Sequence, residues 1–181
     1  MEGPTRIAIL VSGKGSNAKN LIQQSLKEKD VQVALVLSSQ LNVDLNVYCS
    51  NAEVAFECLD PWDSAKAMQI ITGYNAALVV LAGFLRKITP DVIAVFPDRI
   101  LNLHPSLLPK YGGKGMYGKH VHRKVIENQE TESGITVHVV NEAYDEGKIL
   151  AQFSCSVLPK DTPESLEQKI RSLEMQHFPE V

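Results

Sequence analysis

Two hydrogen-bonding side chains, Asn102 and His104, stand two positions apart at the end of an apolar run. Strand side chains alternate between two faces, so a short buried strand over residues 100–103 would point both groups to one side. Pro105 prevents the strand from pairing further. Placed in this way, the two groups could donate hydrogen bonds to an oxygen that becomes negative during acyl or formyl transfer. The alternative is a polar strand end that its own loop satisfies.

A second candidate site follows the apolar run 7–11, where residues 13–18 read Gly-Lys-Gly-Ser-Asn-Ala. This sequence fits the glycine fingerprint of dinucleotide-binding folds, but residues 37–40, at the end of the second predicted strand, include no acid for the ribose hydroxyls. A P-loop sequence is also absent, which disfavours a nucleoside triphosphate. Glycines allow close approach of the backbone, and a helix start presents N–H groups to an anion. We therefore predict a site for a single phosphate, with Ser16, Asn17 and Lys14 as further donors.

The elements that must position these groups alternate between apolar strands and amphipathic helices. We predict strands over 7–11, 31–38, 54–58, 76–82, 100–103, 135–139 and 149–157. Helices are predicted over 18–28 and 42–52, from Asp63 or Ser64 towards residue 74, after Thr89-Pro90, and after Thr162-Pro163. Residues 110–119 contain four glycines and are predicted to be a loop, either a lid or a plain insertion. The pattern indicates a three-layer αβα domain with a Rossmann-like, mostly parallel sheet.

Length and composition fit one globular domain over residues 1–181. The net charge of −3 gives no general attraction to nucleic acid or to an anionic membrane. Cys49, Cys58 and Cys155 show no metal-ligand spacing and are expected to be buried thiols in a reducing compartment. The first residues lack the features of a signal peptide and no apolar run reaches membrane-spanning length, so we expect a cytoplasmic protein.

Four segments together resemble one enzyme family. They are SGKGSN near the start, LAGFLRKITP, LNLHPSLLPKY, and VNEAYDEGKIL further on. In order and spacing over nearly the whole chain, they resemble the phosphoribosylglycinamide formyltransferases of the formyltransferase superfamily. The resemblance implies transfer of a formyl group from 10-formyltetrahydrofolate to the amine of glycinamide ribonucleotide in purine biosynthesis.

The resemblance also implies a catalytic group made of Asn102, His104 and Asp145. Direct attack of the amine on the formyl carbon would give a tetrahedral intermediate whose oxyanion is held by Asn102 and a protonated His104. Asp145 would favour the imidazolium and could relay protons through water. Thr136 and His138 would position Asp145, although His138 could equally be a satisfied strand histidine.

Binding residues are carried over in the same way. Those matching the ribonucleotide site are Gly13, Gly15, Ser16, Asn17 and Glu174, the last contacting the ribose hydroxyls. Those matching the folate pocket are Leu81, Leu85, Arg86, Ile88, Ile93, Ile100, Val140, Asn141, Ala143 and Tyr144. The leucines and isoleucines are equally candidates for the hydrophobic core.

Departures from the family and rival functions limit these expectations. The stretch GGKGMYGKHVH is longer than in some members. We predict that His120 and His122 lie in a loop. We also predict that they bind no metal, because no further ligands complete a set. Family members normally continue past residue 181, so we expect a shortened or naturally short C-terminus. Partners are expected to be the two small molecules only, in a monomer or homodimer. A formyltetrahydrofolate hydrolase-like enzyme and a non-catalytic nucleotide-binding module stay open as alternatives.

Overall fold

The structure, a computed structural model, describes residues 3–181. Contacts divide the chain into two compact units, one ending at Leu101 and the other beginning at Asn102. The first two residues of the predicted domain lie outside the described residues. The single domain over 1–181 stays a prediction.

The first unit is built on four parallel strands in the order β3-β2-β1-β4. These are β1 (Thr5–Val11), β2 (Val31–Ser38), β3 (Ala55–Cys58) and β4 (Leu78–Leu81). Ile9 of β1 pairs with Val36 on one side and with Val80 on the other. Continuous apolar runs form these strands because both faces of a parallel sheet are covered, and Ile9 is fully buried.

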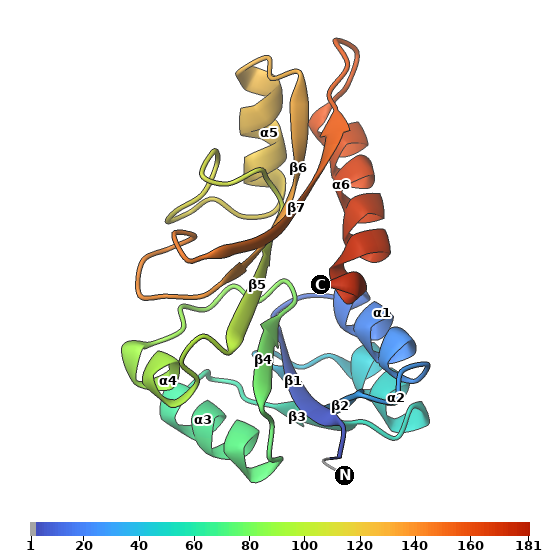
Figure 1. The fold of residues 1–181 in the computed structure, drawn as a ribbon. Coiled ribbons are helices and arrows are strands. Elements are labelled where there is room, and N and C mark those ends of the chain that lie inside the picture. Colours follow the sequence, from blue (N-terminus) through green and yellow to red (C-terminus); the bar gives the residue numbers. More distant parts are fainter. Residues whose placement is uncertain (1–2) are drawn as a thin grey trace. The chain divides into compact units, whose positions relative to one another are not determined.

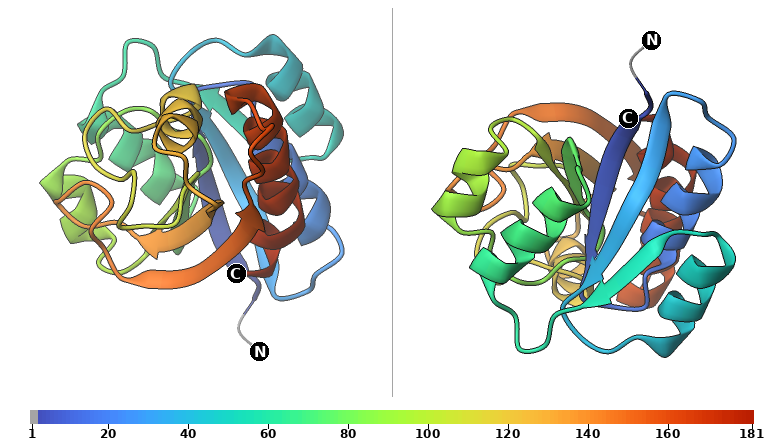
Figure 2. Two further views of the ribbon diagram at one scale, coloured as in Figure 1. Left: turned by 90° about the horizontal axis from the view of Figure 1, so that it is seen from above. Right: turned by 90° about the horizontal axis from the view of Figure 1, so that it is seen from below.

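Four helices cover this sheet, with α1 and α2 on one face and α3 and α4 on the other (Figures 1 and 2). They are α1 (Ser16–Ser25), α2 (Val43–Asn51), α3 (Ser64–Gly73) and α4 (Pro90–Val95). Asn42 caps α2 by accepting the N–H of Leu45, and Asp63 caps α3 by accepting that of Lys66. This unit therefore has the predicted three layers.

The predicted boundaries of α1 are wrong. The helix spans Ser16–Ser25 rather than 18–28, because Gly15 takes the left-handed conformation (φ 75°) that turns the chain directly into the helix. At the other end, the N–H groups of Lys27 and Glu28 bond three residues back, to Gln24 and Ser25, and the helix stops. Ser16 and Asn17 consequently lie in the first turn of α1.

The second unit continues from β5 (Ile100–His104) and contains the antiparallel pair β6 (Glu132–Val139) and β7 (Ile149–Ser156). Helices α5 (Lys119–Glu127) and α6 (Pro163–His177) pack against each other, and the short 3-10 helix η1 (Phe178–Glu180) follows α6 (Figure 1). A capping box between Thr162 and Ser165 starts α6, as the Thr-Pro pair predicts. Leu166 and Ile170 bury the inner face of this helix.

One expectation for this unit is wrong. Helix α5 was not predicted, and it takes His120 and His122 out of the expected loop. Only Val121, His122 and Val125 of α5 are buried, so its apolar pattern is too sparse to reveal a helix. In β6, Thr136 and His138 are at most 2% exposed. Within residues 3–181, no helix has both the length and the apolar character needed to cross a membrane.

Candidate active site

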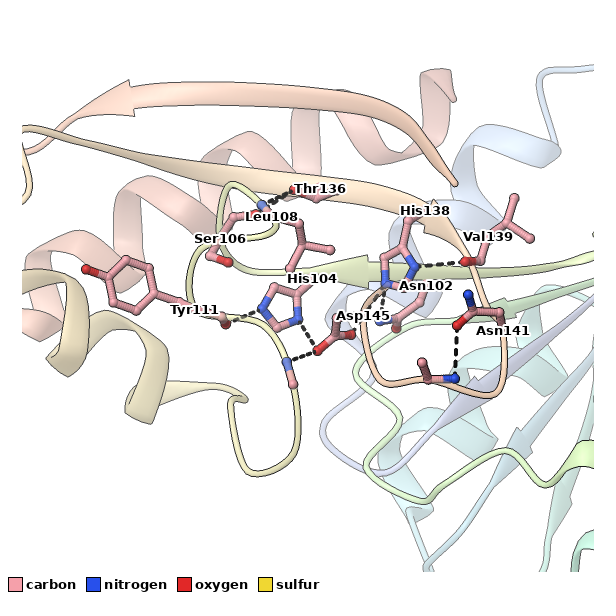
Figure 3. A network of polar contacts seen from close by, with 12 residues as sticks. Asn102, His104, Ser106, Leu108, Tyr111, Thr136, His138, Val139, Asn141 and Asp145 are labelled. Carbon is pink, nitrogen blue, oxygen red and sulfur yellow. Dashed lines mark hydrogen bonds and ion pairs between the residues drawn. The ribbon is translucent and has the colours of Figure 1, made fainter. Parts of the chain in front are cut away.

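Asn102 and His104 lie on β5, separated by the buried Leu103, and face the same group of polar side chains (Figure 3). His104 is 3% exposed. Its Nε2 lies 2.8 Å from the carbonyl oxygen of Tyr111, and its Nδ1 lies 3.5 Å from Oδ2 of Asp145. Both ring nitrogens of His104 thus face oxygen acceptors.

Asp145 lies between two histidines, in the connection from β6 to β7 (Figure 3). Its Oδ2 accepts the backbone N–H of Gly113 at 2.9 Å, and its Oδ1 lies 3.5 Å from Nε2 of His138. The residue holds a left-handed backbone conformation, φ 58°. Its side chain is 12% exposed. A largely buried carboxylate is therefore shared by His104 and His138.

His138 determines the orientation of the Asn102 amide. Nδ1 of His138 faces the carbonyl oxygen of Val139 at 2.9 Å, so this nitrogen carries the proton. In the neutral ring, Nε2 is then an acceptor, and it lies 3.1 Å from Nδ2 of Asn102. The Asn102 amide therefore donates one of its two N–H groups to His138.

The side chains of His104 and Asp145, which face each other, both have shifted pKa values. Burial lowers the pKa of His104, and this effect outweighs the opposite influence of the Asp145 carboxylate and the Tyr111 carbonyl. Burial raises the pKa of Asp145, but the neighbouring rings of His138 and His104 and the Gly113 N–H together bring it below its ordinary value. Asp145 is therefore an anion, and the resting His104 is mainly neutral at pH 7.

The protonated His104 that the resemblance implies for the tetrahedral intermediate stays a prediction. Asp145 acts on the pKa of His104 in the predicted direction, yet removing the ring from water has the larger effect. The sequence could place a carboxylate near the ring through the resemblance, but it could not reveal that only 3% of His104 is exposed.

The hydrogen bonds of Thr136 hold the loop that follows β5. Its Oγ1 donates to the carbonyl of Ser106 at 2.7 Å and accepts the N–H of Leu108 at 3.0 Å. Gln152 of β7 donates to the same Oγ1 and to the carbonyl of Leu108, both at 2.9 Å. The predicted role of Thr136 in positioning Asp145 stays a prediction, whereas His138 lies 3.5 Å from Asp145.

The site contains the residue types of the formyl transfer motif, and a family model for formyl transferase matches residues 5–181. The chain belongs to the formyl transferase family. The chain is 36% identical over 190 residues to the chloroplastic phosphoribosylglycinamide formyltransferase of Arabidopsis thaliana, covering 97% of the chain and 63% of that relative. It is 31% identical to the phosphoribosylglycinamide formyltransferase of Haemophilus influenzae, covering 97% and 84%.

Solved structures agree with these relatives. The chain matches glycinamide ribonucleotide transformylase 1 from Symbiobacterium toebii with a TM-score of 0.90 and 31% identity, covering 98% of the chain and 85% of that structure. The match confirms the predicted α/β fold class and the resemblance inferred from sequence. The chain spans 63% and 59% of the lengths of its Arabidopsis and Vigna unguiculata relatives.

The predicted phosphate-site residues lie at the start of α1. A Cβ on Gly15 would come 2.6 Å from Cδ2 of Leu45, and the residue holds φ 75°, so this turn favours glycine. The carbonyl of Gly13 accepts a hydrogen bond from the side chain of Asn42 at 2.8 Å. Ser16 is exposed and Asn17 is 9% exposed. The turn is thus rigid and its helix start presents backbone N–H groups.

The predicted folate residues differ widely in exposure. Ile100 is fully buried, and Leu81 and Ile88 are 5% and 7% exposed, so these three belong to the hydrophobic core in this structure. Leu85 is 60% exposed. The remaining ones, Arg86, Ile93, Val140, Asn141, Ala143 and Tyr144, are exposed or half-buried, as is Glu174 of α6. Their predicted roles in binding stay predictions.

Several groups at the site were not found from the sequence. The carbonyl of Tyr111 and the N–H of Gly113 are backbone groups, which carry no sequence signal for the partner they meet. Gln152 looks like an ordinary polar residue of a half-buried strand. Among residues 3–181, no group of three or more His, Cys, Asp or Glu is placed to hold a metal ion.

Proposed function

We propose that this formyl transferase moves the formyl group of 10-formyltetrahydrofolate to the amine of glycinamide ribonucleotide. The observation that carries the proposal is the convergence of Asn102, His104 and Asp145, with His138 joined to both Asn102 and Asp145. Relatives and solved structures that bear the name of this activity support it.

The chemistry requires stabilisation of one developing charge and movement of one proton. The substrate nitrogen attacks the formyl carbon, a C–N bond forms, and the carbonyl electron pair moves onto oxygen. The attacking nitrogen loses a proton and the folate nitrogen gains one as its bond to the formyl carbon breaks. The C=O bond is restored in the product, so no oxidant or reductant is needed.

Asn102 and His104 divide these tasks. Since His138 takes one N–H of the Asn102 amide, the second N–H is assigned to the oxyanion. An oxyanion next to His104 would raise the pKa of that ring, because a nearby negative charge favours the cation. His104 then gains its proton as charge develops, and the anionic Asp145 at 3.5 Å stabilises it. Asp145, whose pKa is low, is a poor base by itself.

The remaining roles complete the proposal. The turn at Gly13, Gly15, Ser16 and Asn17 binds the substrate phosphate, and Glu174 binds its ribose. The exposed folate residues, Leu85 and Arg86 among them, contact the cosubstrate. No metal, nucleic acid or membrane takes part, and the active form is a monomer or homodimer. The cytoplasmic location stays a prediction, since the names of the two plant relatives include the word chloroplastic.

The deciding experiment supplies purified protein with glycinamide ribonucleotide and 10-formyltetrahydrofolate, then measures tetrahydrofolate and the formylated amine. We expect equal amounts of the two products. His104→Ala should reduce turnover by about 10²–10⁴-fold, as for loss of a general acid or base. The matched variant His120→Ala, on an exposed position of α5, should leave turnover unchanged. Formate release without the amine would instead indicate a hydrolase, and absence of any product from folded protein would contradict the proposal.

A further inference from the structure

The backbone from Tyr111 to Gly113 touches both partners of the proposed proton transfer, and we call residues 111–113 the bracket. The carbonyl of Tyr111 faces Nε2 of His104 at 2.8 Å, and the N–H of Gly113 faces Oδ2 of Asp145 at 2.9 Å. An acceptor thus meets the histidine and a donor meets the carboxylate. This polarity supports a cationic ring beside an anionic carboxylate.

The bracket fits closely against its surroundings. Tyr111 holds φ 58°, in the left-handed region that a residue with a Cβ seldom occupies. A Cβ on Gly112 would come 2.6 Å from Cδ2 of Leu108 and 3.2 Å from Cβ of Asp145. The direction of the Tyr111 carbonyl therefore depends on a backbone conformation that something else must hold.

The side chain of Tyr111 supplies such a restraint. Its hydroxyl donates to Oε1 of Glu130 at 2.9 Å and accepts from Nδ2 of Asn128 at 2.9 Å. Lys110 binds both carboxylate oxygens of Glu130, at 3.1 and 2.9 Å. Asn128 is the C-cap of α5, so these bonds tie the bracket to the end of that helix.

The residues before the bracket are fastened separately. Thr136 holds Ser106 and Leu108, and the Ser106 hydroxyl donates to the carbonyl of Lys110 at 2.6 Å. The Tyr111 hydroxyl is the next anchor along the chain. Removing it would leave the loop attached up to Lys110 but would free the residues that meet His104 and Asp145.

We propose that Tyr111 is a positioning residue, whose hydroxyl, held by Asn128 and Glu130, sets the bracket against His104 and Asp145. The inference rests on the proposed function, in which His104 gains a proton during the reaction. The inference concerns how the resting structure prepares His104 for this proton. Its consequence, a change in the pKa of His104, can be measured without turnover.

Loss of the hydroxyl has a defined effect on His104. The groups facing this ring are the carboxylate of Asp145, the ring of His138 and the carbonyl of Tyr111. Of these, the carbonyl and the carboxylate both favour the cation. When the Tyr111 carbonyl is no longer held in place, the His104 cation loses one of the two groups that stabilise it. The pKa of His104 should then fall further below its ordinary value.

The test compares Tyr111→Phe with Tyr117→Phe, the same change at a 50% exposed position of the same loop. NMR titration of the His104 ring gives its pKa, and steady-state kinetics give kcat and KM. For Tyr111→Phe we expect a lower His104 pKa, kcat reduced by about fivefold or more, and both KM values within about twofold, from loss of ordinary hydrogen bonds. Tyr117→Phe should match the wild type in each measurement.

Glu130 provides a second pair of variants in case Tyr111→Phe does not fold. Glu130→Ala should behave as Tyr111→Phe, whereas Glu130→Gln keeps an acceptor for the hydroxyl and should restore most of kcat. A His104 pKa and kcat equal to those of the wild type in both Tyr111→Phe and Glu130→Ala would overturn the role of Tyr111. If no variant and no wild-type protein transfers formyl groups, the proposed function fails, and the His104 titration still decides whether Tyr111 positions the ring.

Discussion

Replacement of Asn102 by alanine separates two tasks that one amide performs. In the structure its Nδ2 gives one N–H to Nε2 of His138 at 3.1 Å. In the proposed reaction, the second N–H meets the oxyanion. Asn102→Ala removes both donors while leaving His104 and Asp145 chemically unchanged, so it should affect stability and catalysis by separate and predictable amounts.

The size of each effect follows from the contacts. His138 is 2% exposed, and its Nδ1 proton is committed to the Val139 carbonyl, so Nε2 would lose its donor in a buried place. An unsatisfied buried acceptor costs about 1–3 kcal/mol of unfolding free energy. Loss of one preorganised oxyanion donor raises the barrier by about 2.7–4 kcal/mol, equivalent to about 10²–10³-fold in kcat. Binding of either substrate should change far less.

Denaturant unfolding and steady-state kinetics measure the two effects on one preparation. The matched control is Asn46→Ala, on an exposed position of α2, for which we expect a change within about 0.5 kcal/mol in unfolding free energy and unchanged kcat. If Asn102→Ala lost stability as expected but kept its kcat within about threefold, the amide would have only a structural role, and the assignment of its second N–H to the oxyanion would be refuted.

Other changes test the loop, the bracket and a buried histidine. Thr136→Val should lower the unfolding free energy by about 2–4 kcal/mol in denaturant melts, because three groups lose a buried hydrogen-bond partner. Gly112→Ala would push on Leu108 and should reduce kcat by about 10- to 100-fold in the formyl transfer assay, whereas Gly73→Ala, with open space around it, should not. His122 is 3% exposed with a lowered pKa, mainly from burial, so the unfolded state binds its proton more readily. Stability should therefore fall as the pH drops below about 6.5, and unfolding at pH 8 and pH 5 should show a smaller fall for His122→Leu.

The fold was largely predictable because its strands carry continuous apolar runs. Residues 31–38 match β2 without error, and the Thr162-Pro163 pair marks the start of α6. Helix α5 escaped prediction for a physical reason. It buries one side with two valines and a histidine, and His122 reads as polar although it is 3% exposed. Patterns based on hydrophobicity cannot recognise a buried histidine as part of a core face.

The site was predictable only where side chains alone define it. Strand alternation put Asn102 and His104 on one face without any knowledge of the tertiary structure. Asp145 came from resemblance, since 41 positions of chain separate it from His104 and no local pattern connects them. The Tyr111 carbonyl and the neutral state of His104 depend on backbone direction and on burial. These properties arise only when the loop is anchored by Thr136 and by the Tyr111 hydroxyl.

The same contacts explain why one histidine, rather than two, is suited to proton transfer. His138 has Nδ1 facing the Val139 carbonyl and Nε2 facing the Asn102 amide, so both of its ring nitrogens have close partners. His104 has acceptors at both nitrogens, and its 3.5 Å separation from Asp145 is looser than an ordinary hydrogen bond. A proton arriving at Nδ1 therefore forms an ion pair without breaking an existing contact. Two histidines share one carboxylate, and the proposed reaction assigns the transferred proton to His104.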